Sequence, residues 1–397
     1  MSKKTIRDIT VEQKRVLVRV DLNLPIDEAT GQIIDDSRIK AVLPTIKYLT
    51  EHQARVILIS HLGRPKGKVV EKLRMGSIAA RLSEILGQPV EITRDCVGPE
   101  AASAVNKMQD GDVILLENLR FHPEEEANNA DFARSLASLA DIYVNDAFGT
   151  AHRAHASVVG VTEYLPSVAG LLLEKEIKNL SGILKNPTHP FAALLGGAKV
   201  SDKVAMIDNI MAKVNFILIG GGMAASFLKA QGYDVGSSSV ESDIVAVADR
   251  LLKHAQDSGV QLLLPNDVVV TDDITLRGSA ETVPIGDIPA NRYIVDIGPK
   301  TIERFRDTLR GCRTVFWNGP MGIYEIKQFA TGTLTLARVI ASLEATTVIG
   351  GGSTADAITD LGLADKFSFV STGGGASLDF LSGKTLPGIA ALPDKEP

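Results

Sequence analysis

Short apolar runs alternate with longer amphipathic stretches along nearly the whole chain. Val16–Val20 and Val56–Ser60 are such runs, and each is followed by a stretch whose apolar positions recur at roughly helical spacing, Ser37–Leu49 and Ser77–Leu86. Alternation of strands and helices predicts mostly parallel sheets covered by helices. The strands are apolar almost without interruption, which is typical of strands buried on both faces. We therefore expect an α/β fold.

The predicted strands end in different chemistry in the two halves of the chain. In the first half they run into arginine and histidine, in Val56–Arg64, Val113–His122 and Ile142–Arg153. In the second half they run into glycine clusters, in Phe191–Gly197, Asn215–Gly222, Thr346–Gly352 and Phe367–Gly375. Ligands of open α/β sheets bind beyond the carboxyl ends of the strands. The first half therefore predicts an anion site, and the second predicts a nucleotide site made of bare backbone amides.

Composition narrows the class of protein. A chain of 397 residues exceeds what one hydrophobic core usually supports, so we expect two domains. The net charge of −6 argues against a nucleic-acid binder. The two cysteines, Cys96 and Cys312, lie far apart and form no zinc-finger spacing, which favours a reducing compartment. The chain shows no apolar signal region and no apolar stretch long enough to span a bilayer. We expect a cytoplasmic protein that contacts no membrane.

The segment Leu171–Pro190 is the predicted seam between the domains. Its apolar residues recur at roughly helical spacing, and Asn186-Pro187 and His189-Pro190 end the helix. An ordinary surface helix has the same pattern. The change in strand-end chemistry at this point favours a helix that joins two domains.

Polar residues in the first half are candidates for binding a small polyanion. Asp21 and Asn23 follow a strand on the same side, where they can bind a hydroxyl and a carboxylate or simply cap a turn. Guanidinium groups bind carboxylate and phosphate oxygens two at a time. One arginine alone is usually a solvated surface charge, but parallel strands bring several such loops to one edge. The basic residues at these loops are Arg38, His61, Arg64, Arg120 and Arg153.

Three further histidines, His122, His152 and His155, either extend this basic patch or form local hydrogen bonds. His152 and His155 have an H-x-x-H spacing. No carboxylate lies at a helical offset from them, and Arg153 between them would repel a cation. A metal site at this pair is therefore disfavoured.

The glycine clusters of the second half are candidates for phosphate and nucleotide binding. Gly196–Lys203 follows a strand and opens a predicted helix, with Lys199 and Lys203 four residues apart on one face. The chain lacks both the Walker A spacing and the G-x-G-x-x-G fingerprint, which disfavours a dehydrogenase. Trp317–Glu325 can hold an adenine ring, with Glu325 near a ribose, or can be only a rigid Gly-Pro turn. Gly350–Thr354 and Gly373–Gly375 each follow a strand and precede a helical stretch.

Nine segments together resemble phosphoglycerate kinases, in the order and approximate spacing of that family and along essentially the whole chain. They are Val20–Pro25, Ser37–Ala41, Ser60–Pro65, Glu117–His122, Asn145–Ser157, Leu195–Lys203, Ile219–Ala224, Trp317–Glu325 and Ser371–Leu378. The resemblance implies two doubly wound, Rossmann-like domains with parallel sheets, joined by a connecting helix. The implied parts are an N-terminal domain (1–170), the helix (171–188), a nucleotide-binding domain (189–378) and a C-terminal segment (379–397) that returns to the N-terminal domain.

The resemblance also assigns roles to single residues. The implied 3-phosphoglycerate site is Asp21, Asn23, Arg38, His61, Leu62, Gly63, Arg64, Arg120 and Arg153. The implied nucleotide site is Gly197, Lys199, Lys203, Gly220, Gly221, Gly222, Asn318, Pro320, Ile323, Glu325, Gly351, Gly352, Ser353 and Thr354. The residues implied at the transferred phosphoryl group are Arg38, Lys203, Gly373 and Gly374.

The activity implied by the resemblance is transfer of a phosphoryl group between 1,3-bisphosphoglycerate and ADP, giving 3-phosphoglycerate and ATP, with Mg²⁺, by a monomer. We expect in-line transfer after hinge closure, because phosphoryl transfer depends on alignment and charge neutralisation. One position departs from the family: Ser353 stands where the family has an aspartate that contacts the nucleotide-bound metal. We expect weaker metal coordination there. Two alternatives are a catalytically weakened nucleotide- and anion-binding relative, and another α/β enzyme.

Overall fold

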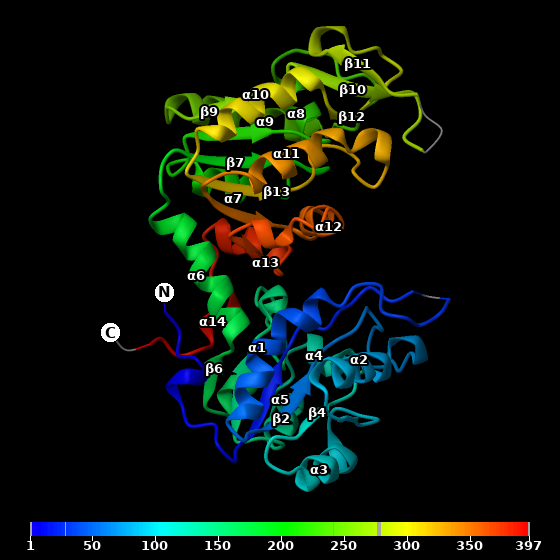
Figure 1. The fold of residues 1–397 in the computed structure, drawn as a ribbon, viewed down its shortest axis with the longest axis vertical. Coiled ribbons are helices and arrows are strands. Elements are labelled where there is room, and N and C mark those ends of the chain that lie inside the picture. Colours follow the sequence, from blue (N-terminus) through cyan, green and yellow to red (C-terminus); the bar gives the residue numbers. More distant parts are fainter. Residues whose placement is uncertain (1, 28, 241, 276–278, 396–397) are drawn as a thin grey trace. The chain divides into compact units, whose positions relative to one another are not determined.

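The computed structural model describes residues 2–27, 29–240, 242–275 and 279–395, which divide into two compact units. Unit 1 comprises residues 1–178 and 385–397, and unit 2 comprises residues 179–384. The boundary falls inside helix α6 (Leu171–Lys185), labelled in Figure 1. Within the described residues, no helix combines the length and apolar character needed to cross a membrane.

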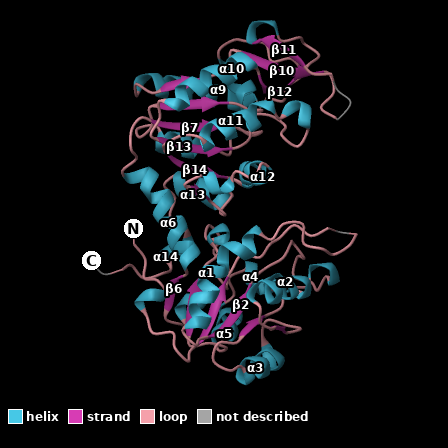
Figure 2. Cartoon of the chain, in the orientation of Figure 1, coloured by secondary structure: helices cyan, strands magenta, loops and turns pink. Residues whose placement is uncertain are grey.

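Unit 1 is built on a six-stranded parallel sheet, drawn with its helices in Figure 2. Its central strand β1 (Arg15–Arg19) pairs with β2 (Arg55–Ile59) on one side and with β5 (Ile142–Asn145) on the other. The strand order is β3 (Val90–Ile92), β4 (Val113–Leu115), β2, β1, β5, β6 (Ser167–Ala169). The helices are α1 (Ser37–Glu51), α2 (Gly76–Leu86), α3 (Gly98–Lys107), α4 (Pro123–Glu126) and α5 (Ala130–Ala137). Because all strands are parallel, the loops after β1, β2, β4 and β5 leave the same edge of the sheet.

Alternation along the strands explains why this sheet is covered on both faces. Val16 and Val18 of β1 belong to one apolar cluster with Ile39 and Val42 of α1, while Leu17, between the two valines, is buried on the opposite face. Two buried faces require apolar residues at every strand position, which is the uninterrupted apolar pattern of the sequence.

Unit 2 repeats this style with a second six-stranded parallel sheet. Its order is β15 (Phe369–Val370), β14 (Thr346–Gly350), β13 (Thr314–Asn318), β7 (Phe191–Leu195), β8 (Phe216–Ile219), β9 (Gln261–Leu263). The helices of this unit are α7 (Val204–Ile210), α8 (Met223–Ala230), α9 (Ser242–Asp257), α10 (Pro299–Arg310), α11 (Thr331–Ala341), α12 (Gly352–Asp360) and α13 (Gly375–Leu381). The two parallel sheets confirm the predicted α/β class.

A small antiparallel sheet in unit 2 was not predicted. It has the order β11 (Glu281–Pro284), β10 (Asp267–Thr271), β12 (Tyr293–Ile297) and its own apolar cluster around Val268 and Val270. A parallel connection needs a crossover of about a dozen residues or more, and the link between β10 and β11 is too short for one, so these two strands pair as a hairpin. Strand β12 pairs antiparallel with the other edge of β10.

The end of the chain packs in unit 1. The backbone N–H of Gly388, in helix α14 (Pro387–Ala390), donates to the carbonyl of Ala151 at 2.9 Å, and the Asn145 side chain donates to the carbonyl of Gly388 at 3.2 Å. Near the other end of the chain, the Lys3 ammonium donates to the carbonyl of Leu392 at 2.7 Å.

A buried carboxyl group lies at the start of α6. Asp146 Oδ1 accepts hydrogen bonds from the backbone N–H groups of Leu172 at 2.9 Å and Leu173 at 3.0 Å. These N–H groups belong to the first turn of the helix, where no intrahelical acceptor is available, so Asp146 satisfies them. Burial raises the pKa of this carboxyl to about 7, against opposing contributions from Thr45 and the two N–H groups.

Candidate active site

The basic residues of unit 1 surround His61, which follows β2 and is buried. Burial holds the pKa of His61 well below its ordinary value, and four guanidinium groups lower it further, those of Arg19, Arg120, Arg153 and Arg38. His61 is therefore neutral at pH 7. Four arginines from separate segments of this unit therefore lie near enough to His61 to act on its charge.

Arg19 was missed by the sequence reasoning, although it is the best-buried member of this cluster. It lies in β1, and its Nη2 atom is 3.0 Å from Nδ1 of His61. A guanidinium can only donate, so Nδ1 accepts and the ring proton of neutral His61 lies on Nε2. Arg19 thereby leaves His61 with one N–H donor for a ligand. The signal in the sequence is an arginine inside an otherwise apolar strand.

Arg19 is itself held by a chain of buried polar groups. Its Nε donates to the hydroxyl of Ser157 at 3.0 Å, and that hydroxyl donates to Oε1 of Glu125 at 2.6 Å. Burial raises the pKa of Glu125, and Arg19 opposes that rise. Glu125 and Ser157 were also missed, because a glutamate in a run of three glutamates gives no sequence sign of burial.

Arg120 has a buried donor that the described protein does not use. It lies between β4 and α4, is buried, and donates from Nη1 to the carbonyl of Gly63 at 2.8 Å. Its Nε and Nη2 atoms are buried and form no hydrogen bond with any described residue, although Nε forms an ion pair with the Glu126 carboxylate at 3.3 Å. Burial lowers the pKa of Arg120. Buried donors are nearly always satisfied, so an anionic ligand is the expected partner of Nη2.

Arg38, Asp21 and Asn23 belong to the same region. Arg38, in the first turn of α1, forms an ion pair with Asp21. Asn23 accepts a hydrogen bond from the backbone N–H of Gly63 at 2.8 Å, and its own N–H donates to Asp21 at 3.2 Å. These hydrogen bonds agree with the interpretation that Asp21 and Asn23 cap a turn. The same two residues also lie beside the basic cluster.

Two other predicted members of the site lie in the loop after β2. Leu62 is buried and exchanges hydrogen bonds with the Asn118 side chain, at 3.2 Å to its N–H and 2.8 Å to its carbonyl. Arg64, two residues after Leu62 in the same loop, has an exposed side chain.

The three further histidines separate into different roles. His155 faces the cluster, where burial lowers its pKa to about 4 with help from Arg19, Arg120 and Arg153. His152 accepts from the Nε of Arg153 at 3.3 Å. Neither belongs to a metal-type group of side chains in the described part of the chain. His122 instead contacts Asp95, with 2.6 Å between its Nε2 and the Asp95 Oδ1.

In unit 2, three glycine loops pack directly against each other at the ends of β7, β8 and β13. The N–H of Gly197 donates to the carbonyl of Pro320, and the N–H of Gly221 donates to that of Met321, both at 2.9 Å. Gly221 has φ +63°, and a Cβ on it would lie 2.6 Å from the Gly197 nitrogen. Only glycine fits this approach, because the backbone of one loop occupies the side-chain position of the next.

Lys203 lies beside these loops but not as the sequence predicted. Helix α7 begins at Val204, so Lys199 and Lys203 do not share a helix face, and that prediction is wrong. The left-handed Gly197, with φ +89°, turns the chain into an irregular loop that delays the helix. Lys203 is buried, and burial lowers its pKa while the nearby Asp202 carboxylate opposes that shift. A buried ammonium that no described carboxylate holds in an ion pair is suited to an anionic ligand.

In the candidate nucleotide site, side-chain hydrogen bonds join the segments that follow β13 and β14. Asn318 donates to the carbonyl of Gly350 at 2.8 Å, and the N–H of Gly319 donates to the hydroxyl of Thr354 at 2.7 Å. Gly351, with φ +97°, precedes α12, and Gly352 and Ser353 form its exposed first turn. Free N–H groups at this turn favour an anion.

The remaining predicted positions lie in two loops. Ile323, in the loop after β13, donates its N–H to the carbonyl of Val295 at 2.9 Å, and Glu325 is exposed two residues later. Gly373 donates its N–H to the Ser371 hydroxyl at 3.1 Å, and Gly374, with φ +50°, precedes α13. The loop with Ile323 is the one whose Pro320 and Met321 carbonyls accept hydrogen bonds from Gly197 and Gly221.

The residues around Ser353 fit Mg²⁺ only as part of a nucleotide complex. Ser353 offers an exposed hydroxyl, and the Thr354 hydroxyl is already engaged with Gly319. No group of three carboxylate, histidine or cysteine side chains lies close together in the described part of unit 2. Mg²⁺ keeps several waters and binds through phosphates plus one or two carboxylates, so this donor set supplies no protein cage.

Comparisons of this sequence and structure with known proteins all point to the same family. The family model described as phosphoglycerate kinase matches residues 6–384. The phosphoglycerate kinase of Pelotomaculum thermopropionicum is 56% identical over 395 residues, with 100% of each chain covered. Solved phosphoglycerate kinase structures from Coxiella burnetii (39% identity, TM-score 0.87) and Pyrococcus horikoshii (35%, 0.88) each align over 98% of both chains. The chain belongs to the phosphoglycerate kinase family.

Proposed function

We propose that this chain transfers a phosphoryl group reversibly from the acyl phosphate of 1,3-bisphosphoglycerate to ADP, giving 3-phosphoglycerate and ATP in glycolysis. As a family member it is a phosphotransferase whose acceptor is a carboxyl group. The observation that carries the proposal is the buried Nη2 donor of Arg120, which no described residue satisfies, in the arginine cluster around neutral His61. Relatives named phosphoglycerate kinase give no support to the alternative of a weakened, non-catalytic relative.

The basic cluster of unit 1 is assigned to the triose. Arg120 and Arg153 bind the phosphate that is not transferred, and His61 adds its Nε2–H donor. Asp21 and Asn23 hold the hydroxyl and carboxylate end. Arg64 is assigned to the same substrate, with its side chain exposed in the loop after β2.

The glycine loops of unit 2 are assigned to the nucleotide. Backbone amides around Gly197, Gly221 and Gly352 suit phosphate oxygens, because glycine lets the backbone approach them closely. Lys203 supplies a buried positive charge for the transferred group, and the amides at Gly373 and Gly374 complete the donors around it. Glu325 and Ile323 are assigned to the nucleoside.

Catalysis by this chain consists of alignment and charge neutralisation. The acceptor carboxylate of 3-phosphoglycerate is already ionised, so no general base is required. Arg38 from unit 1 and Lys203 from unit 2 neutralise the transferring group, which requires the two units to close around both substrates and exclude water. Ser353 would lie near Mg²⁺ held by the nucleotide phosphates, and the ion would supply additional positive charge there.

A coupled assay of ATP formation from the acyl phosphate tests the activity directly. In the same assay Arg38→Ala should lower kcat by roughly 100-fold or more, while the affinity for ADP changes little, because Arg38 is assigned to the transferring group. Arg134→Ala, on the exposed surface of α5, is the matched control. Equal losses in kcat and ADP affinity would reassign Arg38 to folding or general binding, and no ATP from the wild-type chain would overturn the activity.

The family resemblance also supports a monomer in the cytoplasm, with small-molecule substrates and no nucleic-acid partner. Sedimentation at enzyme concentrations used in the assay tests the oligomeric state, and a dimer peak that persists on dilution would contradict it.

A further inference from the structure

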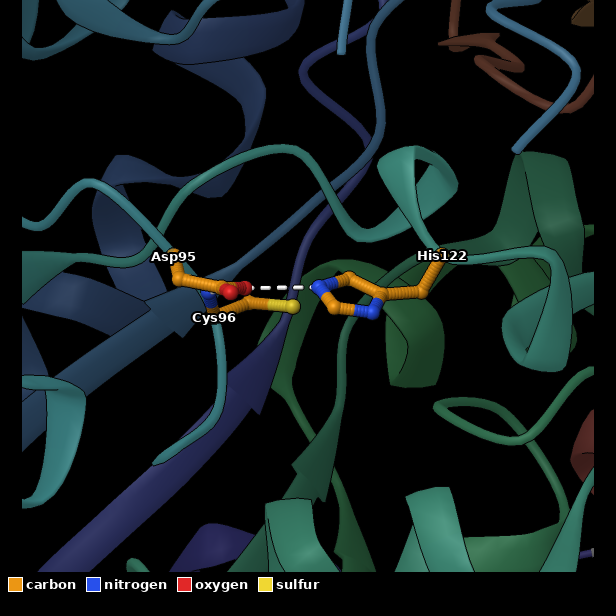
Figure 3. A group of neighbouring side chains, drawn as sticks. All are labelled: Asp95, Cys96 and His122. Atoms are coloured by element: carbon orange, nitrogen blue, oxygen red, sulfur yellow. Dashed lines mark hydrogen bonds and ion pairs between the residues drawn. The ribbon is translucent and has the colours of Figure 1, made fainter. Parts of the chain in front are cut away.

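Three side chains with metal-binding atoms converge in unit 1 at a position that the proposed activity does not use. Asp95 and Cys96 lie in the loop between β3 and α3, and His122 lies between the 3₁₀ turn Leu119–Phe121 and α4. Figure 3 shows the three side chains pointing toward one another from these two segments. One ligand atom from each residue lies within 4.8 Å of the others.

The chemistry of the three groups matches one class of ion. A thiolate, an imidazole and a carboxylate are together typical ligands of zinc and of similar divalent transition metals, whereas magnesium and calcium prefer oxygen alone. Two anionic ligands and one neutral ligand balance a divalent charge. No spacing in the sequence indicates this set, because the two cysteines of the chain are far apart and His122 is distant from Cys96.

The ligand atoms are held in place by neighbouring groups. The Thr93 hydroxyl donates to the carbonyl of Asp95 at 2.6 Å, and the N–H of Cys96 donates to the Asp95 carboxylate at 2.7 Å. The ring of His122 packs beside Phe132, with 5.1 Å between ring centroids. Such supporting contacts fix the direction in which ligands point.

The sulfur ligand of the site is buried, and the other two ligands are accessible to solvent. Cys96 is fully buried, while the side chains of Asp95 and His122 are 48% and 28% exposed. Burial raises the pKa of the Cys96 thiol, and the nearby carboxylates of Asp95 and Glu125 raise it further. These same carboxylates would attract a cation at the sulfur atom.

We propose that Asp95, Cys96 and His122 form a binding site for one zinc-class divalent cation, with a water molecule as the fourth ligand. Tetrahedral zinc separates nitrogen and oxygen ligands by roughly 3.3 Å, so the Asp95–His122 contact, now 2.6 Å, must open slightly. The exposed Asp95 side chain can make that movement. On binding, the thiol proton passes to solvent, and Nε2 of His122 must carry no hydrogen, so the neutral ring holds its proton on Nδ1.

An ion at this site would add a second connection between two loops whose described residues already meet in the Asp95–His122 contact. His122 follows Arg120 by two residues, in the same connection between β4 and α4. Metal binding would therefore tie the β3–α3 loop to the segment that carries a candidate substrate arginine. This inference does not depend on the proposed catalytic activity, and zinc binding tests it separately.

The test is a titration of the purified full-length chain with zinc against a chromophoric chelator, after removal of bound metal. We expect one zinc ion per wild-type chain. Cys96→Ser and His122→Gln should each weaken binding by at least about 10-fold, because each removes one of three protein ligands. Cys312→Ser is the matched control, since Cys312 is the other buried cysteine and lies in unit 2.

Cobalt provides a second readout that identifies the ligand. Cobalt bound at this site should show absorption from thiolate-to-metal charge transfer, present in the wild-type and Cys312→Ser chains and lost in Cys96→Ser. His122→Gln keeps the result decisive if Cys96→Ser fails to fold, because His122 is partly exposed. The proposal is overturned if the wild-type chain takes up no zinc, or if the Cys96 and His122 variants bind it as tightly as the wild type.

Discussion

Replacing Asp146 by asparagine should change how the stability of unit 1 depends on pH. Asp146→Asn keeps the Oδ1 acceptor for the N–H groups of Leu172 and Leu173 and removes the ionisable proton. The folded chain holds that proton with a pKa of about 7, against an ordinary value of 3.8. This difference corresponds to about 4 kcal/mol, which applies in full because the group is completely buried.

The sign follows from which state binds the proton. Between about pH 4 and pH 7 the folded chain binds it and the unfolded chain does not, so the stability due to Asp146 is full below about pH 4 and lost as pH rises to about 7. The Asp146→Asn variant has no ionisable proton at this position, so it does not lose this stability as pH rises. The free energy of unfolding of the variant, relative to wild type, should therefore rise by up to about 4 kcal/mol across that range.

Hydrogen exchange is the appropriate assay, because a chain of two units need not unfold in a single step. Exchange of the amides at the start of α6, corrected for its intrinsic pH dependence, gives the free energy of opening for both proteins at each pH. Asp131→Asn, with 86% of the Asp131 side chain exposed, controls for the loss of any carboxylate. Parallel pH profiles for wild type and Asp146→Asn would refute the assignment of a raised pKa to Asp146.

Three other predictions concern unit 2 and its ligands. Gly221→Ala should destabilise unit 2 by more than the roughly 1–2 kcal/mol that a left-handed alanine costs, because the new Cβ would also lie 2.6 Å from the Gly197 nitrogen. Urea unfolding measures the change, with Gly286→Ala as the control because a Cβ there has open space. Ser353→Asp should lower the Mg²⁺ concentration needed for half-maximal activity, by adding a carboxylate; identical Mg²⁺ titrations would show that Ser353 carries no metal-related cost. Small-angle scattering should show compaction only when 3-phosphoglycerate and the nucleotide are both bound, and no compaction in that state would count against closure.

The sequence was sufficient for the sheets and for much of the candidate site, because both depend on local pattern. Uninterrupted apolar strands predict parallel sheets, and the residues after the strands reach one edge whatever the details of packing. This reasoning placed His61 and Arg120 correctly in their loops. It missed Arg19, because an arginine inside an apolar strand does not fit the pattern of a buried strand. The pattern also does not show that His61 is its partner.

The errors come from backbone geometry that a pattern of residue types does not contain. The start of α7 depends on the turn at Gly197, so the spacing of Lys199 and Lys203 suggested a shared face that the structure lacks. The antiparallel sheet around β10 depends on the length of its connections, which is a weaker signal than the composition of its strands. Convergence of Asp95 with His122 is a long-range contact and has no local signature.

The packing of α14 in unit 1 has a consequence for how the chain folds during synthesis. Gly388 pairs with Ala151 and Asn145, yet more than two hundred intervening residues, most of them unit 2, must be made first. A nascent fragment that ends at Lys178 can form the first sheet but leaves the carbonyl of Ala151 and the amide of Asn145 without these partners. Completion of the first unit therefore waits for the last part of the chain to leave the ribosome.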